Sequence, residues 1–384
     1  MLALDLLLPL SLLLFLLPLN PLLSSAASVT WVALQLLAAP ADRRWAAWPA
    51  LFVVMLSSRS WLLNQTTHPA SLEDGILFAS VLIVASCINP KRLRYLPFLP
   101  LLVLPALLFQ LGDSPLIADH LIREGRHWTP NFFAGVNQGA YVLGILLLIC
   151  TAWLFEASVT NWQRILAGAS SGLAFVLLIH TGSRAALLSS GLALTVCWLT
   201  NYPHRINPWL KALFLASAGV SVLAIKQLIR PSTLGLPGVD VMSDTGRVKI
   251  ANCFLNIPFS GNNRFLFGVG PQNLSNYCTD PIHGGVADHA HNIYLQIFAA
   301  SGILALAGLF LILVYLAVCS IKSRDLVDPF LLLCSKLVLV YALLQGFLDL
   351  SVLHWPVSIV LTGILVGIPL APAIPNNASG AGSP

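Results

Sequence analysis

Charged side chains are scarce in this sequence, since Asp, Glu, Lys and Arg together make up only 9% of its 384 residues. Soluble domains carry roughly a quarter. Hydrophobic residues reach 57%, and the mean hydropathy is +0.83. So few charges exclude a cytosolic enzyme, a disordered binding protein and a nucleic-acid-binding protein, although the formal net charge is +5. We expect a chain that is solvated mainly by membrane lipids.

Signs of β-structure, of internal repeats and of a soluble domain are also missing. The apolar runs are long, rich in Leu and without period-two alternation, which favours helices over strands. We therefore expect an all-α, polytopic integral membrane protein. Residues 1–372 are interpreted as a single transmembrane domain, and residues 373–384 as a disordered tail.

Polar residues divide the apolar runs into about twelve predicted transmembrane helices of about 20 residues each. The first run could be mistaken for a signal peptide. However, it has no basic residues before it, contains Asp5 and leads through residues 18–21 into a second apolar run, so a spanning hairpin is favoured. The predicted spans are residues 2–20, 22–40, 45–63, 74–89, 96–111, 132–156, 165–180, 185–200, 209–229, 291–318, 329–348 and 352–371.

Basic residues in the short loops predict the orientation of these spans. They fall in alternate loops, which marks those loops and both termini as cytoplasmic; the residues are Arg43, Arg44, Lys91, Arg92, Arg94, Arg164, Arg205, Lys211, Lys322 and Arg324. The segments 64–73, 112–131, 181–184, 230–290 and 349–351 then face outward. The loop of about sixty residues between the ninth and tenth spans, 230–290, is the only part long enough for a small folded cap.

Two of the seven cysteines, Cys253 and Cys278, lie in this outward loop rather than in or next to a span. In an oxidising compartment they can form a disulfide. Two cysteines in one loop do not decide the matter, and pairing and free thiols remain equally open at this point.

The first group of outward polar residues surrounds Arg184, in a connection of about four residues between two spans. One interpretation is an interfacial Arg that reaches the lipid headgroups. The other is an anion site facing a cavity between helices, because a permanently charged guanidinium binds phosphate through two hydrogen bonds.

The second group lies in the long outward loop. Asp244 or Thr245 is expected to cap a helix that starts there, which puts Arg247 and Lys249 in its first turn. The helix dipole disfavours cations at that end, so an anionic partner is expected. Gly268–Gly270 has neither the preceding strand nor the third glycine of a dinucleotide-binding loop. We interpret it as a tight turn, after which Pro271 opens a short helix.

The third group, His289, His291 and Asn292, stands at the outer mouth of the tenth span. Two His at i and i+2 point to different faces of a helix, so a shared metal is not expected, although Asp288, His283 and His289 are a conceivable ligand set. His291 is either a hydrogen-bonded structural residue or a base for proton transfer near neutral pH. At the end of the next span, Asp349 can orient a His or a sugar hydroxyl, or simply mark the membrane boundary.

Taken together, these elements resemble the O-antigen ligase and polymerase family of bacterial inner-membrane glycosyltransferases, and its ligase branch in particular. In the ligase pattern, a His and a small polar residue precede Gly-x-x-Gly by nine residues; His291 and Asn292 reach Gly302 in this way, but Ala305 replaces the second Gly. This departure weakens an inference of close helix packing. The motifs that carry the resemblance are Gly182–Arg184, Thr245–Arg247 with Gly268–Pro271, and His291–Asn292.

The resemblance implies a Gram-negative inner-membrane enzyme with its active site on the periplasmic side. The donor would be O-antigen on undecaprenyl diphosphate and the acceptor a sugar hydroxyl of lipid A–core, with no metal, nucleotide or other cofactor and with inversion at the anomeric carbon. His291 matches the family's general base, and Arg184 and Arg247 match its essential arginines. Further candidate binding residues are Asp349, His289, Asn292, Lys249, Arg264, Arg123 and Arg126.

Other functions fit the sequence less well. An O-antigen polymerase would use the same donor with another acceptor, and an O-oligosaccharyltransferase would, by resemblance, carry a larger outward domain. A transporter would place its polar residues near the midplane of the membrane, often in corresponding positions of two halves. Here the polar residues gather at one face, which favours chemistry on lipid-borne substrates.

Overall fold

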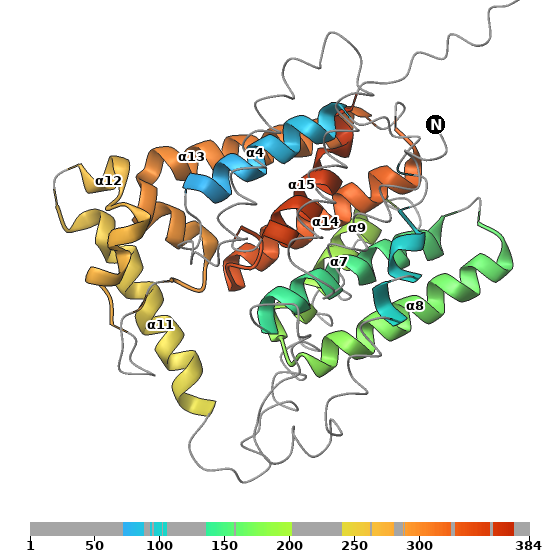
Figure 1. Ribbon diagram of the computed structural model, residues 1–384, viewed down its shortest axis with the longest axis horizontal. Helices are drawn as coiled ribbons and strands as arrows, with labels where there is room; N and C mark the ends of the chain where they lie inside the picture. The colour runs from blue at the N-terminus through green and yellow to red at the C-terminus, as the bar shows by residue number, and fades with distance from the viewer. Residues whose placement is uncertain are drawn as a thin grey trace, which may run out of the picture.

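The computed structural model describes residues 72–87, 93, 96–101, 103–105, 136–156, 159–201, 240–261, 263–279, 287, 289–323, 327–353 and 356–371. These residues form α- and 3-10 helices and no sheet, in agreement with the predicted all-α class (Figure 1). The elements are α4 (Leu72–Cys87), α7 (Val136–Phe155), α8 (Asn161–His180), α9 (Arg184–Asn201), α11 (Asp240–Asn256), η4 (Ile257–Phe259), α12 (Arg264–Phe267), η5 (Pro271–Asn276), α13 (Ile293–Lys322), α14 (Pro329–Leu348), α15 (Pro356–Gly367) and η7 (Ile368–Leu370).

Four helices in the described part of the chain, α7, α8, α13 and α14, are long and apolar enough to cross a membrane. The α14 helix begins and ends at the predicted residues, 329 and 348, and the bounds of α4, α7, α8 and α9 lie within about four residues of the prediction. The predicted spans 2–20, 22–40, 45–63 and 209–229 lie outside the described residues, as do the loop 112–131, both termini and the tail 373–384. The total of twelve spans therefore stays a prediction.

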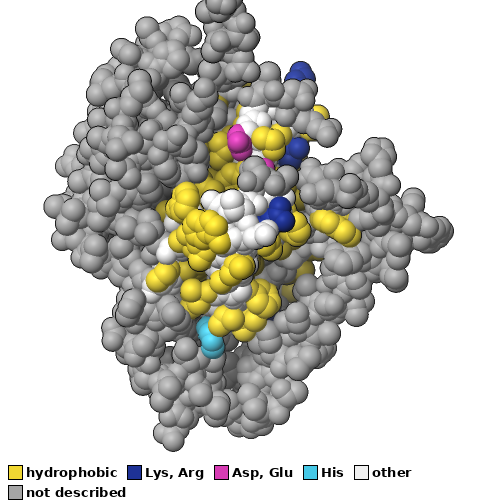
Figure 2. All heavy atoms as spheres, turned by 90° about the vertical axis from the view of Figure 1, so that its right-hand side faces the viewer, with side chains coloured by type: hydrophobic (Ala, Val, Ile, Leu, Met, Phe, Trp, Pro, Cys, Tyr) yellow, Lys and Arg dark blue, Asp and Glu magenta, His cyan; other side chains and the backbone are white. Residues whose placement is uncertain are grey.

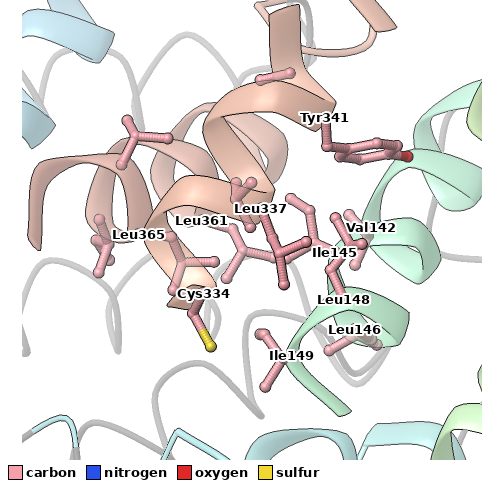
Figure 3. Close-up of a cluster of buried hydrophobic side chains, with 14 of the residues drawn as sticks. Val142, Ile145, Leu146, Leu148, Ile149, Cys334, Leu337, Tyr341, Leu361 and Leu365 are labelled. Atoms are coloured by element: carbon pink, nitrogen blue, oxygen red, sulfur yellow. The ribbon is translucent and has the colours of Figure 1, made fainter. Parts of the chain in front are cut away.

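The centre of the bundle is an apolar contact between α7, α14 and α15, whose side chains point toward one another in Figure 3. Tyr341 of α14 stacks on Tyr141 of α7, with 5.0 Å between the ring centroids. Cys334, two turns earlier in α14, lies beside Ile149, two turns later in α7 (Figure 3). The two helices are therefore antiparallel, and the carboxyl end of α14 lies at the amino end of α7.

Close packing of α4 on α15 depends on two glycines one turn apart. A Cβ atom at Gly363 would approach Cγ1 of Val81 to 2.6 Å, and one at Gly367 would overlap the side chain of Ala85. Small residues at this spacing let two helix backbones approach closely within a membrane. The absence of a Cβ at these two glycines therefore allows α4 to pack closely against α15.

The α13 helix is divided by Gly302, whose φ of 78° and ψ of −176° interrupt the helical backbone. Residues 293–301 are mostly buried, whereas residues 303–322 expose many apolar side chains, among them Leu304, Leu311, Val314, Tyr315 and Ile321. The sequence predicted one continuous span over 291–318. The structure has two segments with different surroundings.

The outward loop predicted at 230–290 contains a folded cap of α11, η4, α12 and η5, which lies at one end of the bundle, at the left of Figure 1. The cap packs on residues 293–301 of α13 through a separate apolar cluster, and Cys253 and Cys278 form a disulfide with 6.0 Å between their Cα atoms. The η5 helix opens at Pro271, as predicted. The cluster consists of Ile250, Phe254, Ile257, Leu274, Cys278, Ala287, Ala290, Ala299 and Ala300.

The predicted start of the helix in this loop is wrong. Asp244 and Thr245 are not its N-caps, because α11 begins at Asp240. Arg247 and Lys249 therefore lie in its middle rather than in its first turn. At that position the helix dipole acts weakly on a charge, so the argument for an anionic partner loses this support.

The end of the bundle away from the cap faces the viewer in Figure 2. Basic side chains lie there beside apolar ones. Arg164 near the start of α8 and Lys322 at the end of α13 belong to loops with the predicted cytoplasmic signal. The cytoplasmic orientation of this end stays a prediction.

Candidate functional site

The amino ends of α7 and α9 lie side by side at the cap end of the bundle. Ser183 Oγ donates to Asn137 Oδ1 at 3.1 Å, and about two turns farther on a Cβ at Gly144 of α7 would approach Ser190 Oγ of α9 to 3.1 Å. The two helices therefore run parallel and in register. Because α14 is antiparallel to α7, its carboxyl end is also at this end of the bundle. Arg184 and Asp349 are thus placed at the same end.

Arg184 is the first residue of α9, directly after a tight turn from α8, as predicted. Thr181 Oγ1 donates to the carbonyl of Leu178 at 2.6 Å and accepts the Ser183 N–H at 3.2 Å, while Gly182 has a φ of 66°. Thr181 and Ser183 are buried, and Arg184 is half-buried. These bonds fix the backbone from which the Arg184 side chain extends.

His291 lies in a short non-helical segment that is attached to its surroundings on both sides. Asn292 caps α13, since its Oδ1 accepts the N–H groups of Tyr294 and Leu295 at 3.0 Å. On the other side, the Ala290 N–H donates to Oε1 of Gln296 at 2.8 Å, and Gln296 is fully buried. The segment around His291 is therefore held by Gln296 of α13 and by Asn292, which caps that helix.

The backbone of His291 has a φ of 51°, a left-handed conformation that residues other than glycine rarely adopt. Such conformations persist only where the surrounding structure holds them, and they cluster at functional sites. The imidazole is half-buried. The conformation turns the chain sharply just before α13 begins.

The sequence placed His289 and His291 on different faces of a helix, and this is wrong. Both residues precede α13, and their rings lie edge to face with 4.3 Å between the centroids. In the segments that the structure describes, no group of three His, Cys, Asp or Glu residues could hold a metal ion. Asp288 and His283, from the alternative ligand set, lie outside those segments.

Asn292 also connects this segment to the carboxyl end of α14, because its Nδ2 donates to the carbonyl of Phe347 at 3.0 Å. Asp349 follows two residues later as the C-cap of α14; it is buried, and its Oδ2 accepts a hydrogen bond from Ser351 Oγ. Close contact of the two helices requires Gly346, where a Cβ would approach Ile293 Cγ2 to 2.8 Å. His291, Asn292 and Asp349 thus belong to one junction of α13 and α14.

The basic residues of the cap occupy two different settings. Arg247 and Lys249 are exposed on α11, next to Ile250, which is 3% exposed and packs in the same apolar cluster as Ala290. Arg264 of α12 donates from Nη1 to Ser260 Oγ at 2.9 Å, and its Cζ lies 5.1 Å from the centroid of the Tyr277 ring. The guanidinium of Arg264 is therefore engaged within the cap.

The structure brings the candidate residues together to different degrees. His289, His291, Asn292 and Asp349 share the junction of α13 with α14, Arg184 lies at the same end of the bundle, and Arg247 and Lys249 lie on the helix that packs over α13. Arg264 instead contacts Ser260 and Tyr277 within the cap. Arg123 and Arg126 are outside the described residues.

Sequence reasoning did not single out two buried glutamines near this junction. Gln296 holds the Ala290 N–H, and Gln345, one turn before Asp349 in α14, is fully buried with no hydrogen-bond partner for Nε2 or Oε1 in the described part of the chain. The available signal was a glutamine within a long apolar helix, because an amide in such a helix requires a partner.

Residues 169–310 of the chain match the family described as O-antigen ligase. The matched segment begins within α8 and ends within α13, so it contains Arg184, Arg247 and His291, whereas Asp349 lies beyond it. A comparison with curated proteins gives no match.

Proposed function

We propose that this chain, which carries an O-antigen ligase family domain at residues 169–310, transfers O-antigen polysaccharide from undecaprenyl diphosphate to a sugar hydroxyl of lipid A–core. The transfer takes place at the periplasmic face of the inner membrane of a Gram-negative bacterium and uses no metal. The observation that carries the proposal is the setting of His291, in a fixed left-handed segment at the end of the bundle where Arg184 and Asp349 also lie.

In the proposed reaction, His291 takes the proton of the acceptor hydroxyl. The hydroxyl oxygen attacks the anomeric carbon of the donor sugar from the side opposite the diphosphate. The bond between that carbon and the diphosphate oxygen breaks, and its electron pair leaves with the diphosphate, so the anomeric configuration inverts. A half-buried imidazole on a rigid backbone suits this role, because proton transfer requires a base held within hydrogen-bond reach.

Negative charge develops on the diphosphate as it leaves, and cations stabilise this charge. We assign this role to Arg184 and Arg247. Arg184 extends from a turn whose backbone is fixed by Thr181, which limits the reorganisation that charge stabilisation would otherwise require. Arg247 and Lys249 are exposed on the cap, where they can reach a substrate that approaches along the membrane. Asp349 is assigned a positioning role next to Asn292, and His289 and Arg264 are secondary candidates.

The disulfide in the cap supports the outward placement of this end. Disulfides such as Cys253–Cys278 form and persist in oxidising compartments such as the bacterial periplasm. The cap also packs directly on the segment that leads to His291. On this proposal, both lipid-borne substrates meet beneath a cap that lies outside the cytoplasm.

The proposal is tested by deleting the gene in its host and separating the lipopolysaccharide on a gel. We expect bare lipid A–core, with long O-antigen still attached to undecaprenyl diphosphate, and restoration of the ladder by the intact gene but not by the His291→Ala variant. Core that carries a single repeat would instead identify an O-antigen polymerase, which has the same donor. An unchanged ladder would exclude both functions.

A further inference from the structure

An exposed apolar surface lies on the cap, on η4 and α12. The exposed fractions are 65% for Phe259, 42% for Phe265, 41% for Leu266 and 63% for Phe267. Phe259 and Phe265 also pack on each other and on Phe298 of α13. We call Phe259, Phe265, Leu266 and Phe267 the α12 patch. Contiguous exposed aromatic side chains on a folded protein mark a surface that is covered by another molecule or by lipid.

The α12 patch is attached to α13 at Gly302, where the surroundings of that helix change. A Cβ at Gly302 would overlap the carbonyl of Leu266, and one at Gly268 would overlap the backbone of Ala300. The N–H groups of Val269 and Gly270 donate to the carbonyls of Ala299 and Ala300, at 3.0 and 2.8 Å. Backbone contact and two hydrogen bonds therefore fix α12 to the break in α13.

The segment of α13 beyond this break has the properties of a span that faces lipid. Residues 303–322 provide about 20 residues of helix, roughly 30 Å, which is the thickness of the hydrocarbon core. Apart from Lys322 in the last turn, its exposed side chains are mostly apolar, for example Leu311 at 71% and Ile321 at 71%. Residues 293–301, by contrast, are buried between the cap and the bundle. The break at Gly302 therefore marks the level at which α13 leaves the lipid, and the α12 patch lies at that level.

We propose that the α12 patch is an interfacial membrane anchor, in which Phe259, Leu266 and Phe267 enter the boundary between headgroups and acyl chains beside α13. Aromatic side chains are enriched at this depth of a bilayer, and short amphipathic segments bind there through their buried apolar area. Lipid is the occupant because α12 is in backbone contact with α13 at Gly302, directly before the exposed apolar residues 303–322. The anchor ties the cap, and through it the His291 segment, to the membrane surface.

The proposal is tested by photocrosslinking of the full chain in nanodiscs of phosphatidylethanolamine and phosphatidylglycerol. The photoreactive residue p-benzoylphenylalanine replaces Phe267 in one variant and Val248 of α11 in the matched control. Both positions carry an apolar side chain in the same cap, with exposed fractions of 63% and 59%, but only Phe267 adjoins the break in α13. A third variant, with the probe at Leu311, defines the yield at a lipid-facing position.

We expect phospholipid adducts, measured by mass spectrometry, at position 267 with a yield near that at position 311 and about tenfold above that at position 248, because only an inserted side chain meets lipid continuously. Retention of the Cys253–Cys278 disulfide checks that the cap is folded in each variant. Equal lipid yields at positions 267 and 248 would overturn the proposal. Crosslinks from position 267 to a second protein chain instead of lipid would also overturn it, because they would identify a protein interface. The measurement involves no glycosyl transfer, so its result is independent of the proposed function.

Discussion

The two parts of α13 on either side of Gly302, called its halves below, are both predominantly apolar but have different surroundings. Residues 293–301 are enclosed by the cap and by α14, and the side chain of Gln296 accepts a hydrogen bond from the backbone N–H of Ala290, next to His291. Residues 303–322 are predominantly apolar, and many of their side chains are exposed, although Leu316 still packs in the core of the bundle. Hydropathy alone does not separate the halves, because a residue buried by protein and a residue buried by lipid are equally apolar. The separation is made at Gly302 by a left-handed backbone.

The largest difference between the two halves is expected in activity. In purified protein supplied with donor and acceptor, His291→Ala should lower the rate of transfer by about 10²–10⁴-fold, the usual contribution of a general base. Leu311→Ala, in the half that faces lipid, should leave the rate near that of the unaltered protein. Binding of the donor, measured separately, should survive His291→Ala, because the diphosphate is assigned to the arginines. Transfer at an unaltered rate would remove His291 from the mechanism.

The break itself can be tested with two glycines of the same helix. Gly302→Val should destabilise the protein by roughly 2–4 kcal/mol, because the new side chain would overlap the Leu266 backbone and force a left-handed conformation on a β-branched residue. Gly308→Ala is the control, since no atom lies within 4 Å of a Cβ there, and it should be neutral or stabilising by up to about 1 kcal/mol. The Tm of each variant in detergent measures the effect. Equal Tm values would contradict the conclusion that close contact with the Leu266 backbone makes a glycine necessary at position 302.

A comparison of the two glycines also shows what the sequence could and could not predict. The ends of α14 were predictable, because Asp328 caps it, Pro329 opens it and its apolar run is unbroken. Gly302 and Gly308 both stand in apolar surroundings within one predicted span, and only the tertiary contact with Leu266 distinguishes them. The resemblance pointed to Gly302, but Ala305 in place of the second Gly weakened the inference of close packing there, and the structure shows Gly302 against the Leu266 backbone.

Within the candidate site, the position of Arg184 in the fold was predictable from the sequence, whereas the backbone at His291 was not. Arg184 was placed correctly, since a connection of about four residues between two long helices leaves little choice. The conformation around His291 was not predictable, because its neighbours Ala290 and Asn292 are held by bonds to Gln296 and Phe347 that form only in the folded chain. The start of α11 was misplaced because Asp240 and Asp244 are both acceptable at the beginning of a helix.

Loss of the disulfide in the cap should increase hydrogen exchange in residues 293–301 of α13 but not in residues 303–322. Replacing Cys253 and Cys278 together by Ala should lower the stability of the cap by about 2–4 kcal/mol, because the closed loop no longer restricts the unfolded chain. Hydrogen exchange should rise at residues 293–301, on which the cap packs. At residues 303–322 it should stay unchanged. A uniform rise over both halves would show that α13 unfolds as one unit and that the division at Gly302 has no energetic meaning.

The smallest expected effect concerns two buried polar side chains, one in each half. Gln296→Leu removes the acceptor of the Ala290 N–H, so the His291 segment should lose its fixed conformation. We expect kcat to fall about tenfold with KM little changed, since one lost hydrogen bond is worth about 1–1.5 kcal/mol and the misplacement affects only the reacting geometry. Ser320→Ala is the control, because Ser320 Oγ is buried without a hydrogen-bond partner in the described residues, and its loss should change neither constant. An equal fall in kcat for both variants would mean that Gln296 acts through general stability, and His291 would then have to be positioned by Asn292 and the α14 junction alone.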